Sequence, residues 1–298
     1  DRFTDHVKTL HMDSDFKFSE EYEAIKRRAP RNACTVAELQ CNRTKNRFTN
    51  ILPFDHSRVK LLPLDDDDEG SDYINANYMP GYNSKREFIA CQGPMKSTID
   101  HFWRMVWEQN VVIIVMVTKL EERGKEKCAQ YWPADQDCHF YGDLQVQMRS
   151  ESILDSYAIR IFDVGLVKTT RTIQQFHFLK WPDFDCPDNT QMLLNFVDVV
   201  RGNIRPSMSG PVIVHCSAGV GRTGTFICVD RLLQHVKDHN TIDVFGTVLE
   251  MRNYRCNMIQ TEVQYIFVHD CMRDSMDDTS EVDDQTDEHI YENGERKC

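Results

Sequence analysis

The chain alternates between short apolar stretches of strand length and longer stretches with helical periodicity. Strand-like stretches lie near residues 72–78, 87–91, 111–117, 144–148, 157–163, 172–180 and 211–215. Helical patterns lie at 98–109, 189–205, 221–237, 243–255 and 261–272. Strands that alternate with helices, with no linker between them, predict one α/β domain over residues 1–272.

The two ends of the chain differ in character. Residues 1–30 predict a helical lead-in, in which Ser19 precedes an acidic first turn and is expected to cap a helix. Residues 273–298 are predicted to form a disordered acidic tail. Residues 274–298 hold ten acidic and two basic side chains, about −8 of the net charge of −12. The net charge argues against nucleic acid as a partner, whereas the rest of the chain is nearly neutral and can still hold a positive pocket for an anion.

Composition excludes several other classes. The longest apolar run, residues 111–117, is too short to cross a membrane, and no apolar secretory core follows the N-terminus. No membrane segment is therefore predicted within this sequence. The eleven cysteines are odd in number and irregularly spaced, with no Cys-x-x-Cys pair and no zinc-type spacing. We expect reduced thiols, most of them packed in the core of a cytoplasmic protein.

The segment from Val212 to Thr225, VIVHCSAGVGRTGT, carries the candidate chemistry. It predicts a buried strand that delivers Cys216 to a tight loop, with a helix beginning at the far end of the loop. Gly219 and Gly221 let successive amide N–H groups point inward, which is a binding site for a phosphate dianion. The same positive field favours a thiolate at Cys216, and Arg222 supplies a planar fork for two phosphate oxygens.

Two other interpretations of this segment are a nucleotide-binding P-loop and a glycine-rich turn. A nucleotide-binding P-loop would need Gly-x-x-x-x-Gly-Lys-Ser/Thr, and the lysine is missing here. A glycine-rich turn with an incidental cysteine would explain the strand and the helix, but not the arginine.

With these residues in place, the chain resembles the classical protein tyrosine phosphatases over residues 15–272. Residues 215–224 match the signature of that family at every position. Further motifs occur in the order of the family: Lys45-Asn-Arg-Phe48, Asp72-Tyr-Ile-Asn-Ala-Asn77, Gln92-Gly-Pro94, Phe102-Trp-Arg-Met-Val-Trp107, Lys127-Cys-Ala-Gln-Tyr-Trp-Pro133, Trp181-Pro-Asp183 and Gln260-Thr-Glu262. With the tail sequence Tyr291-Glu-Asn293, the chain resembles the receptor-type subgroup that has a single catalytic domain and fibronectin-type ectodomains.

The resemblance implies a twisted, mixed central sheet flanked by helices and a phosphatase that needs neither a metal nor a cofactor. It implies hydrolysis of phosphotyrosine in proteins through a phosphate ester on Cys216. Asp183 would protonate the leaving tyrosine and then act as base toward water. Gln260 would position that water with help from Gln264, and Thr223 would assist departure of the thiolate.

The resemblance also implies how the substrate is bound. Phe48 stands where the family usually has tyrosine and would form a wall against the phosphotyrosine ring. Asn50 would bind the peptide backbone of the substrate. The remaining residues of the loop would hold the phosphate: Ser217, Ala218, Gly219, Val220 and Gly221. Four residues would support the site: Glu122, Lys127, His215 and Trp181.

One departure from the family concerns the acid loop, Trp181-Pro-Asp-Phe-Asp-Cys-Pro187, in which Asp185 replaces a glycine. If this position needs a positive φ, aspartate adopts it at a cost, and its charge disfavours a dianionic substrate. A deficit in turnover is therefore expected. Two alternatives stay open: a weakly active or inactive phosphotyrosine-binding protein, and a phosphoinositide or dual-specificity phosphatase.

The tail and the receptor-type resemblance suggest a wider context. Tyr291, once phosphorylated, would fit a Src-homology-2 adaptor domain. The chain would be the cytoplasmic portion of a single-pass membrane receptor.

Overall fold

The computed structural model describes residues 2–65, 68–182 and 184–291, and side chains up to residue 277 in the last helix. Its helices are α1 (Arg2–Arg28), α2 (Ile99–Glu108), α3 (Thr190–Asn203), α4 (Gly221–His239), α5 (Val244–Met251) and α6 (Glu262–Tyr291), with a 3₁₀ turn at Arg43–Lys45. Its main strands are β1 (Arg58–Lys60), β2 (Tyr73–Met79), β3 (Phe88–Cys91), β4 (Ile113–Met116), β7 (Cys138–Tyr141), β8 (Leu144–Ile153), β9 (Tyr157–Leu166), β10 (Thr169–Phe178) and β11 (Val212–His215). A small hairpin pairs β5 (Glu121–Glu122) with β6 (Lys125–Glu126).

The main strands form one mixed sheet in the order β1-β2-β3-β11-β4-β10-β9-β8-β7. The four central strands, β3, β11, β4 and β10, are parallel, and the flanking pairs are antiparallel. All residues of β3, β4 and β11 are buried, as expected for parallel strands covered on both faces. The central position of β11 places its carboxyl end, and therefore Cys216, in the middle of one edge of the sheet.

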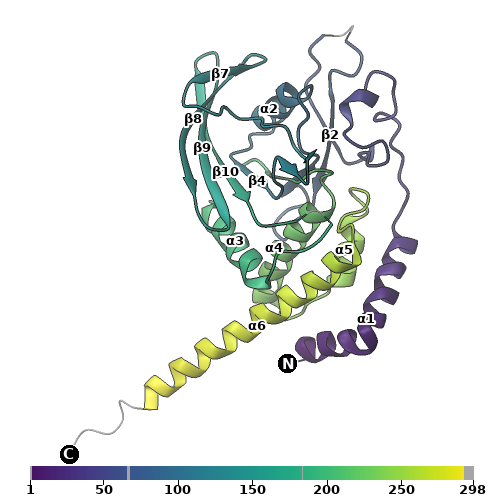
Figure 1. Ribbon diagram of the computed structural model, residues 1–298, viewed down its shortest axis with the longest axis vertical. Helices are drawn as coiled ribbons and strands as arrows, with labels where there is room; N and C mark the ends of the chain where they lie inside the picture. The colour runs from purple at the N-terminus through teal and green to yellow at the C-terminus, as the bar shows by residue number, and fades with distance from the viewer. Residues whose placement is uncertain (1, 66–67, 183, 292–298) are drawn as a thin grey trace, which may run out of the picture.

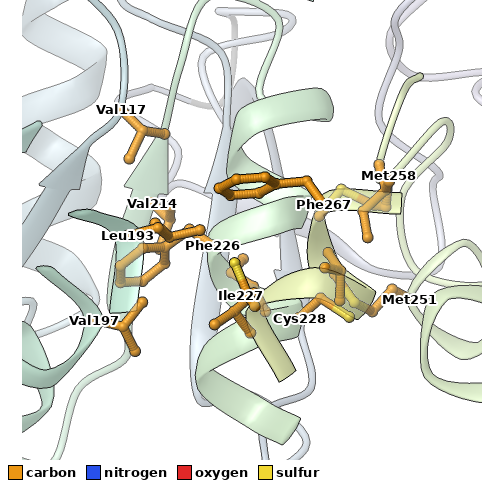
Figure 2. Close-up of a cluster of buried hydrophobic side chains, with 14 of the residues drawn as sticks. Val117, Leu193, Val197, Val214, Phe226, Ile227, Cys228, Met251, Met258 and Phe267 are labelled. Atoms are coloured by element: carbon orange, nitrogen blue, oxygen red, sulfur yellow. The ribbon is translucent and has the colours of Figure 1, made fainter. Parts of the chain in front are cut away.

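Helices cover both faces of the sheet, and a separate core fills each side. Val214 points into the larger core, whereas its neighbour Ile213 points into the smaller one beneath α2, because side chains alternate along a strand. In the larger core, α3, α4, α5 and α6 pack together, and Figure 2 shows Phe226 and Ile227 of α4 among residues from the sheet and from the neighbouring helices. The first half of α4 is therefore almost wholly enclosed, which fixes the helix that begins at Gly221.

The structure confirms the predicted α/β class and the mixed sheet flanked by helices (Figure 1). The predicted strands and helices are present, and most begin and end within a few residues of the expected positions, whereas β8 and α6 extend farther than predicted. Two short edge strands, β1 and β7, were not predicted, because each has only three or four residues and half-exposed sequences carry little periodicity.

The N-terminal helix differs from the continuous lead-in that the sequence predicts. Its backbone turns at residues 12–15, where Asp13, Ser14 and Asp15 all have positive φ. Ser19 does not mark a helix start, and its hydroxyl instead donates a hydrogen bond of 2.5 Å to Oε1 of Glu262. The turn allows both halves of α1 to reach the core, in which Val7 and Phe18 are fully buried.

The last helix, α6, runs to Tyr291 and so passes residue 272, where the sequence places the end of the domain. The division into a domain and a disordered tail stays a prediction. Among the described residues, the helices are all too short or too polar to cross a bilayer.

Candidate active site

The loop between β11 and α4 surrounds the sulfur of Cys216. The side chain of Cys216 is buried, and the backbone N–H of Gly219 donates a hydrogen bond of 3.2 Å to its Sγ. The loop is held from the end of β3, where the N–H of Gly93 donates to the carbonyl of Ser217 at 2.9 Å. The N–H of Gly219 is therefore directed at the sulfur at the start of a helix, as the glycine spacing predicts.

Gly219 is required by both conformation and space. Its φ is +77°, and a Cβ at this position would lie 2.2 Å from the carbonyl oxygen of Cys91. Gly221 is close to a different neighbour, because a Cβ there would lie 3.0 Å from Oε1 of Gln264. The loop can thus approach β3 only with glycine at position 219, whereas a side chain at position 221 would require Gln260 and Gln264 to move slightly.

Arg222 is buried and donates hydrogen bonds to the acid loop and to the hairpin beside it. Its Nη1 donates to Oε1 of Glu122 at 2.7 Å and to the carbonyl of Trp181 at 2.9 Å. Glu122 lies in the β5–β6 hairpin, so this hairpin orients the guanidinium. The structure thereby brings together Arg222, Glu122 and Trp181, all of which the resemblance implied as site residues.

A second buried arginine, Arg255, holds the same loop from behind. Its Nε donates to the carbonyl of Gly219 and its Nη2 to the carbonyl of Ala218, both at 3.0 Å. Nη1 and Nη2 also donate to the side chains of Asn77 and Asn75, both at 2.8 Å. Turning these loop carbonyls outward leaves the neighbouring N–H groups free to point inward. The sequence analysis missed this residue, and the only signal was a pair of asparagines in β2 that needed a buried donor.

A small hollow opens above Cys216. Its lining brings together eight predicted site residues and one that was not predicted, Phe184. The predicted ones are Phe48, Cys216, Ser217, Ala218, Gly221, Arg222, Gln260 and Gln264. Phe48 and Phe184 are both partly exposed and supply the aromatic surface of the hollow. Asn50 is exposed and does not line the hollow.

The two glutamines lie at the start of α6. Oε1 of Gln264 accepts hydrogen bonds from the backbone N–H groups of Gln260 at 3.1 Å and Thr261 at 3.3 Å. Oγ1 of Thr261 accepts in return from the N–H of Gln264 at 3.2 Å. This reciprocal pattern is a capping box, so Gln264 also stabilises the helix terminus beside the hollow.

The acid loop contacts the start of α6. Asp183, the predicted general acid, lies outside the described residues. The hydroxyl of Thr261 donates to the carbonyl of Phe184 at 3.4 Å, and the indole N–H of the buried Trp181 donates to the carbonyl of Asp185 at 2.9 Å.

The structure corrects the expectation of a strained backbone at Asp185. Positive φ occurs at Phe184 (59°) and not at Asp185. The Asp185 side chain is exposed, and its Oδ1 accepts from the N–H of Cys186 at 2.9 Å. Aspartate is therefore accommodated at this position without a left-handed backbone.

His215 is fully buried behind the nucleophile. Burial lowers the pKa of its imidazole to about 3, so the ring is neutral at physiological pH. Nε2 of Gln175 donates to the hydroxyl of Tyr131 at 2.7 Å, and this hydroxyl donates in turn to Nε2 of His215 at 2.8 Å. Nδ1 then carries the proton and faces the carbonyl of Cys216 at 3.3 Å. His215 is thus placed to orient the backbone at Cys216.

The remaining predicted residues also have definite positions. The hydroxyls of Ser217 and Thr223 are buried and have no hydrogen-bond partner within the part of the chain that the structure describes. Val220 is buried, and its carbonyl accepts from the N–H of Ile259 at 2.9 Å. Lys127 is half-buried, and its backbone N–H donates to the carbonyl of Leu120 at 2.8 Å.

Comparison with known proteins supports the same interpretation. Residues 42–274 match the family model of the protein-tyrosine phosphatases. The receptor-type tyrosine-protein phosphatase eta of Homo sapiens is 47% identical over 296 residues, which cover 98% of this chain and 22% of that protein. Tyrosine-protein phosphatase 99A of Drosophila melanogaster is 43% identical over 285 residues, or 91% of this chain and 21% of that protein. The receptor-type tyrosine-protein phosphatase alpha of Homo sapiens is 42% identical over 278 residues, or 91% of this chain and 34% of that protein.

The chain spans only about a fifth to a third of the length of these relatives. The family match nevertheless covers every strand of the main sheet, and it includes the loop that carries Cys216, the residue Arg222 and the start of α6. Taken with the geometry of that loop, these matches show that the chain belongs to the protein-tyrosine phosphatase family, and that it is similar to receptor-type members of that family.

Proposed function

We propose that this chain hydrolyses phosphotyrosine in proteins with Cys216 as nucleophile. The observation that carries the proposal is the convergence on one hollow of the Cys216 sulfur, the inward N–H of Gly219 and the clamped guanidinium of Arg222. A phosphate in this hollow would have a nucleophile below it and positive donors around its oxygens.

In the first step, the sulfur of Cys216 attacks phosphorus, the S–P bond forms and the P–O bond to tyrosine breaks. Asp183 gives its proton to the leaving phenolate oxygen. In the second step, Asp183 removes a proton from water, which attacks phosphorus while the S–P bond breaks. Gln260 is proposed to position this water, and the unpaired hydroxyl of Thr223 to stabilise the departing thiolate.

Selectivity for phosphotyrosine would come from the aromatic walls. Phe48 and Phe184 line the hollow and would hold an aryl ring by stacking and edge contacts. Phosphoserine has no ring to fill this space, so its phosphate would reach the sulfur without comparable contacts. Asn50, two residues after Phe48, is proposed to bind the backbone of the substrate peptide outside the hollow.

The test is a steady-state assay on a phosphotyrosine peptide, with phosphoserine peptide and an inositol lipid phosphate as competing substrates. Cys216→Ser should abolish turnover. Arg222→Lys should lower kcat/KM by about a hundredfold or more, because a single ammonium cannot form the two-oxygen fork. Wild-type turnover no faster than that of Cys216→Ser would instead favour a phosphotyrosine-binding protein.

Asp183→Ala tests the role of the acid separately. This variant should lose turnover while still binding the phosphopeptide, because the side chain is proposed to act in bond breaking and not in binding. An equal loss of affinity and rate would contradict the assignment.

The setting of the whole protein is a further proposal. The similarity to receptor-type relatives supports a cytoplasmic catalytic portion of a single-pass membrane receptor. Phosphorylation of Tyr291 would create a site for a Src-homology-2 adaptor domain. A pull-down with a phosphorylated and an unphosphorylated 285–298 peptide tests the adaptor proposal.

A further inference from the structure

The loop between β11 and α4, which carries Cys216, is called the catalytic loop below. Two cysteines outside this loop lie against the same backbone oxygen. Cys34 belongs to the segment after α1, and Cys256 belongs to the connection between α5 and α6. Each Sγ lies 3.6 Å from the carbonyl oxygen of Leu52. The two sulfurs therefore cannot be farther apart than twice that distance, although the residues are distant in sequence.

The pair has access to solvent. Cys34 and Cys256 are only partly buried, and Cys256 lines a surface hollow together with Tyr22, Asn32 and Phe54. Other thiols near the catalytic loop differ in this respect: Cys91 and Cys128 are fully buried, and burial raises the pKa of both, that of Cys91 to about 12. A small oxidant in the hollow would thus reach Cys256 more readily than these buried thiols.

We propose that Cys34 and Cys256 are a modification site, at which a hydroperoxide converts the two thiols into a reversible disulfide. The sulfur of Cys256 attacks one peroxide oxygen, the O–O bond breaks, and with hydrogen peroxide one water leaves as a sulfenic acid forms. The sulfur of Cys34 then attacks this sulfenic sulfur. The S–H bond of Cys34 and the S–O bond of Cys256 break, the S–S bond between the two residues forms, and a second water leaves. The thiol pair loses two electrons, and the peroxide gains them.

The order of the two steps follows from the surroundings of Cys34. Burial raises the pKa of its thiol to about 11, with the neighbouring Cys256 as the next cause. Cys34 therefore stays protonated at neutral pH and reacts slowly with peroxide, so Cys256 is oxidised first and Cys34 gives up its proton as it attacks the sulfenic sulfur. The disulfide would join the segment after α1 to the segment that carries Arg255 and Gln260, both of which contact the catalytic loop or line its hollow.

The test uses the full chain with Cys216→Ser, so that the nucleophile cannot react. The folded protein is treated with graded hydrogen peroxide, the remaining thiols are alkylated, and the chain is cleaved after Arg, Lys and Glu. Cleavage after Arg31, Glu38, Arg255 and Glu262 gives Asn32–Glu38 and Cys256–Glu262, each with one cysteine. We expect these two peptides to be joined with the loss of two hydrogens, and dithiothreitol to separate them.

Serine variants of single cysteines show which thiols form the disulfide. Cys34→Ser and Cys256→Ser should each abolish the joined peptide, whereas Cys41→Ser should leave it unchanged. In the urea-unfolded chain Cys34 should pair mainly with the nearby Cys41, because short loops close more readily. The proposal is overturned if the folded chain joins Cys34 to Cys41, or if both thiols proceed to sulfinic acid with no joined peptide.

Discussion

The geometry of the catalytic loop depends on side chains that never contact the phosphate. Arg255 donates to two loop carbonyls and is fully buried. Its other acceptors are amide oxygens of Asn75 and Asn77 rather than carboxylates, so the guanidinium keeps its positive charge close to the loop. Arg255 therefore places a positive charge on the side of the loop that faces away from Cys216, and Arg222 places another at the rim of the hollow.

Arg255→Lys should lower kcat/KM by about tenfold to a hundredfold. Charged hydrogen bonds contribute about 1.5–3 kcal/mol each, and lysine can replace only some of those lost. The measurement is steady-state kinetics together with the thermal midpoint of unfolding.

Arg201→Lys is the matched control for this experiment. Arg201 pairs with Asp230 and Glu87 away from the loop, so the control should lower stability and leave kcat/KM nearly unchanged. Normal kcat/KM in Arg255→Lys would show that the loop keeps its shape without this arginine.

The site residues that could be predicted from the sequence are those whose contacts lie close to them along the chain. Cys216, Gly219 and Arg222 lie in one short segment, so a strand, a tight loop and a helix start suffice to bring them together. Arg255 and Tyr131 could not be predicted, because their partners are backbone carbonyls and a histidine from distant segments. Phe184 was missed because an aromatic residue in a loop gives no sign of which surface it will line.

At the level of elements, the acid loop is shaped by its hydrogen bonds more than by backbone strain. Trp181 is buried beneath the loop and ties it to both Arg222 and Asp185. The positive φ falls on Phe184, so the aspartate that replaces glycine affects the site mainly through its charge.

Asp185→Asn should raise kcat/KM by about twofold to fivefold at low ionic strength, because removing an exposed negative charge favours a dianionic substrate. The gain should shrink as salt is added, since screening weakens interactions between exposed charges. Asp185→Gly should gain no more than Asp185→Asn. A clearly larger gain with glycine would mean that backbone freedom, not charge, limits the loop.

The two halves of α1 are joined to α6 through His11. Its Nδ1 contacts Asp15 and its Nε2 contacts Asp270, both at 2.8 Å. Burial opposes protonation of this ring, but the hydrogen bonds to Asp270 and Asp15 outweigh it and raise the pKa. Arg273 also contacts Asp270 at 3.0 Å, so the aspartate retains a cationic partner when His11 is neutral.

Because the pKa of His11 is raised in the folded state, its stabilising effect is complete below the unfolded value of about 6.5 and is lost as pH rises through the folded value. The thermal midpoint of wild type should therefore exceed that of His11→Gln by more at pH 6 than at pH 8.5. An equal difference at both pH values would show that His11 acts through packing alone. Phe18 offers such packing, because its ring meets that of His11 edge-on.

The order of the main elements could be predicted because buried parallel strands and long amphipathic helices have strong periodic patterns. The turn in α1 could not be predicted, since aspartate and serine do not require a positive φ and adopt it here because both halves of α1 pack on the core. The short strands at the sheet edges, β1 and β7, were missed because three or four residues are too few to establish an alternating pattern.

For the whole molecule, packing helices on both faces of the sheet places several histidines in apolar surroundings. Burial lowers the pKa of His177 to about 4, that of His215 to about 3 and that of His269 to about 4. For His177 the nearby Arg160 is a second cause. All three rings are neutral in the folded chain at physiological pH, whereas in the unfolded chain each would take up a proton near pH 6.5.

The folded state should therefore lose stability as pH falls below about 6.5, because the unfolded chain binds more protons than the folded one. Each histidine contributes a slope of at most about 1.4 kcal/mol per pH unit, until pH reaches its own folded value. Urea unfolding of the wild type at pH 7, 6 and 5 measures the combined slope. His269→Gln should reduce this slope by at most about 1.4 kcal/mol per pH unit, and its ring lies among those of Phe18 and Tyr265, away from the catalytic loop. A free energy of unfolding that stays constant from pH 7 to pH 5 would mean that these buried rings are protonated without unfolding, and that the core admits more water than their burial implies.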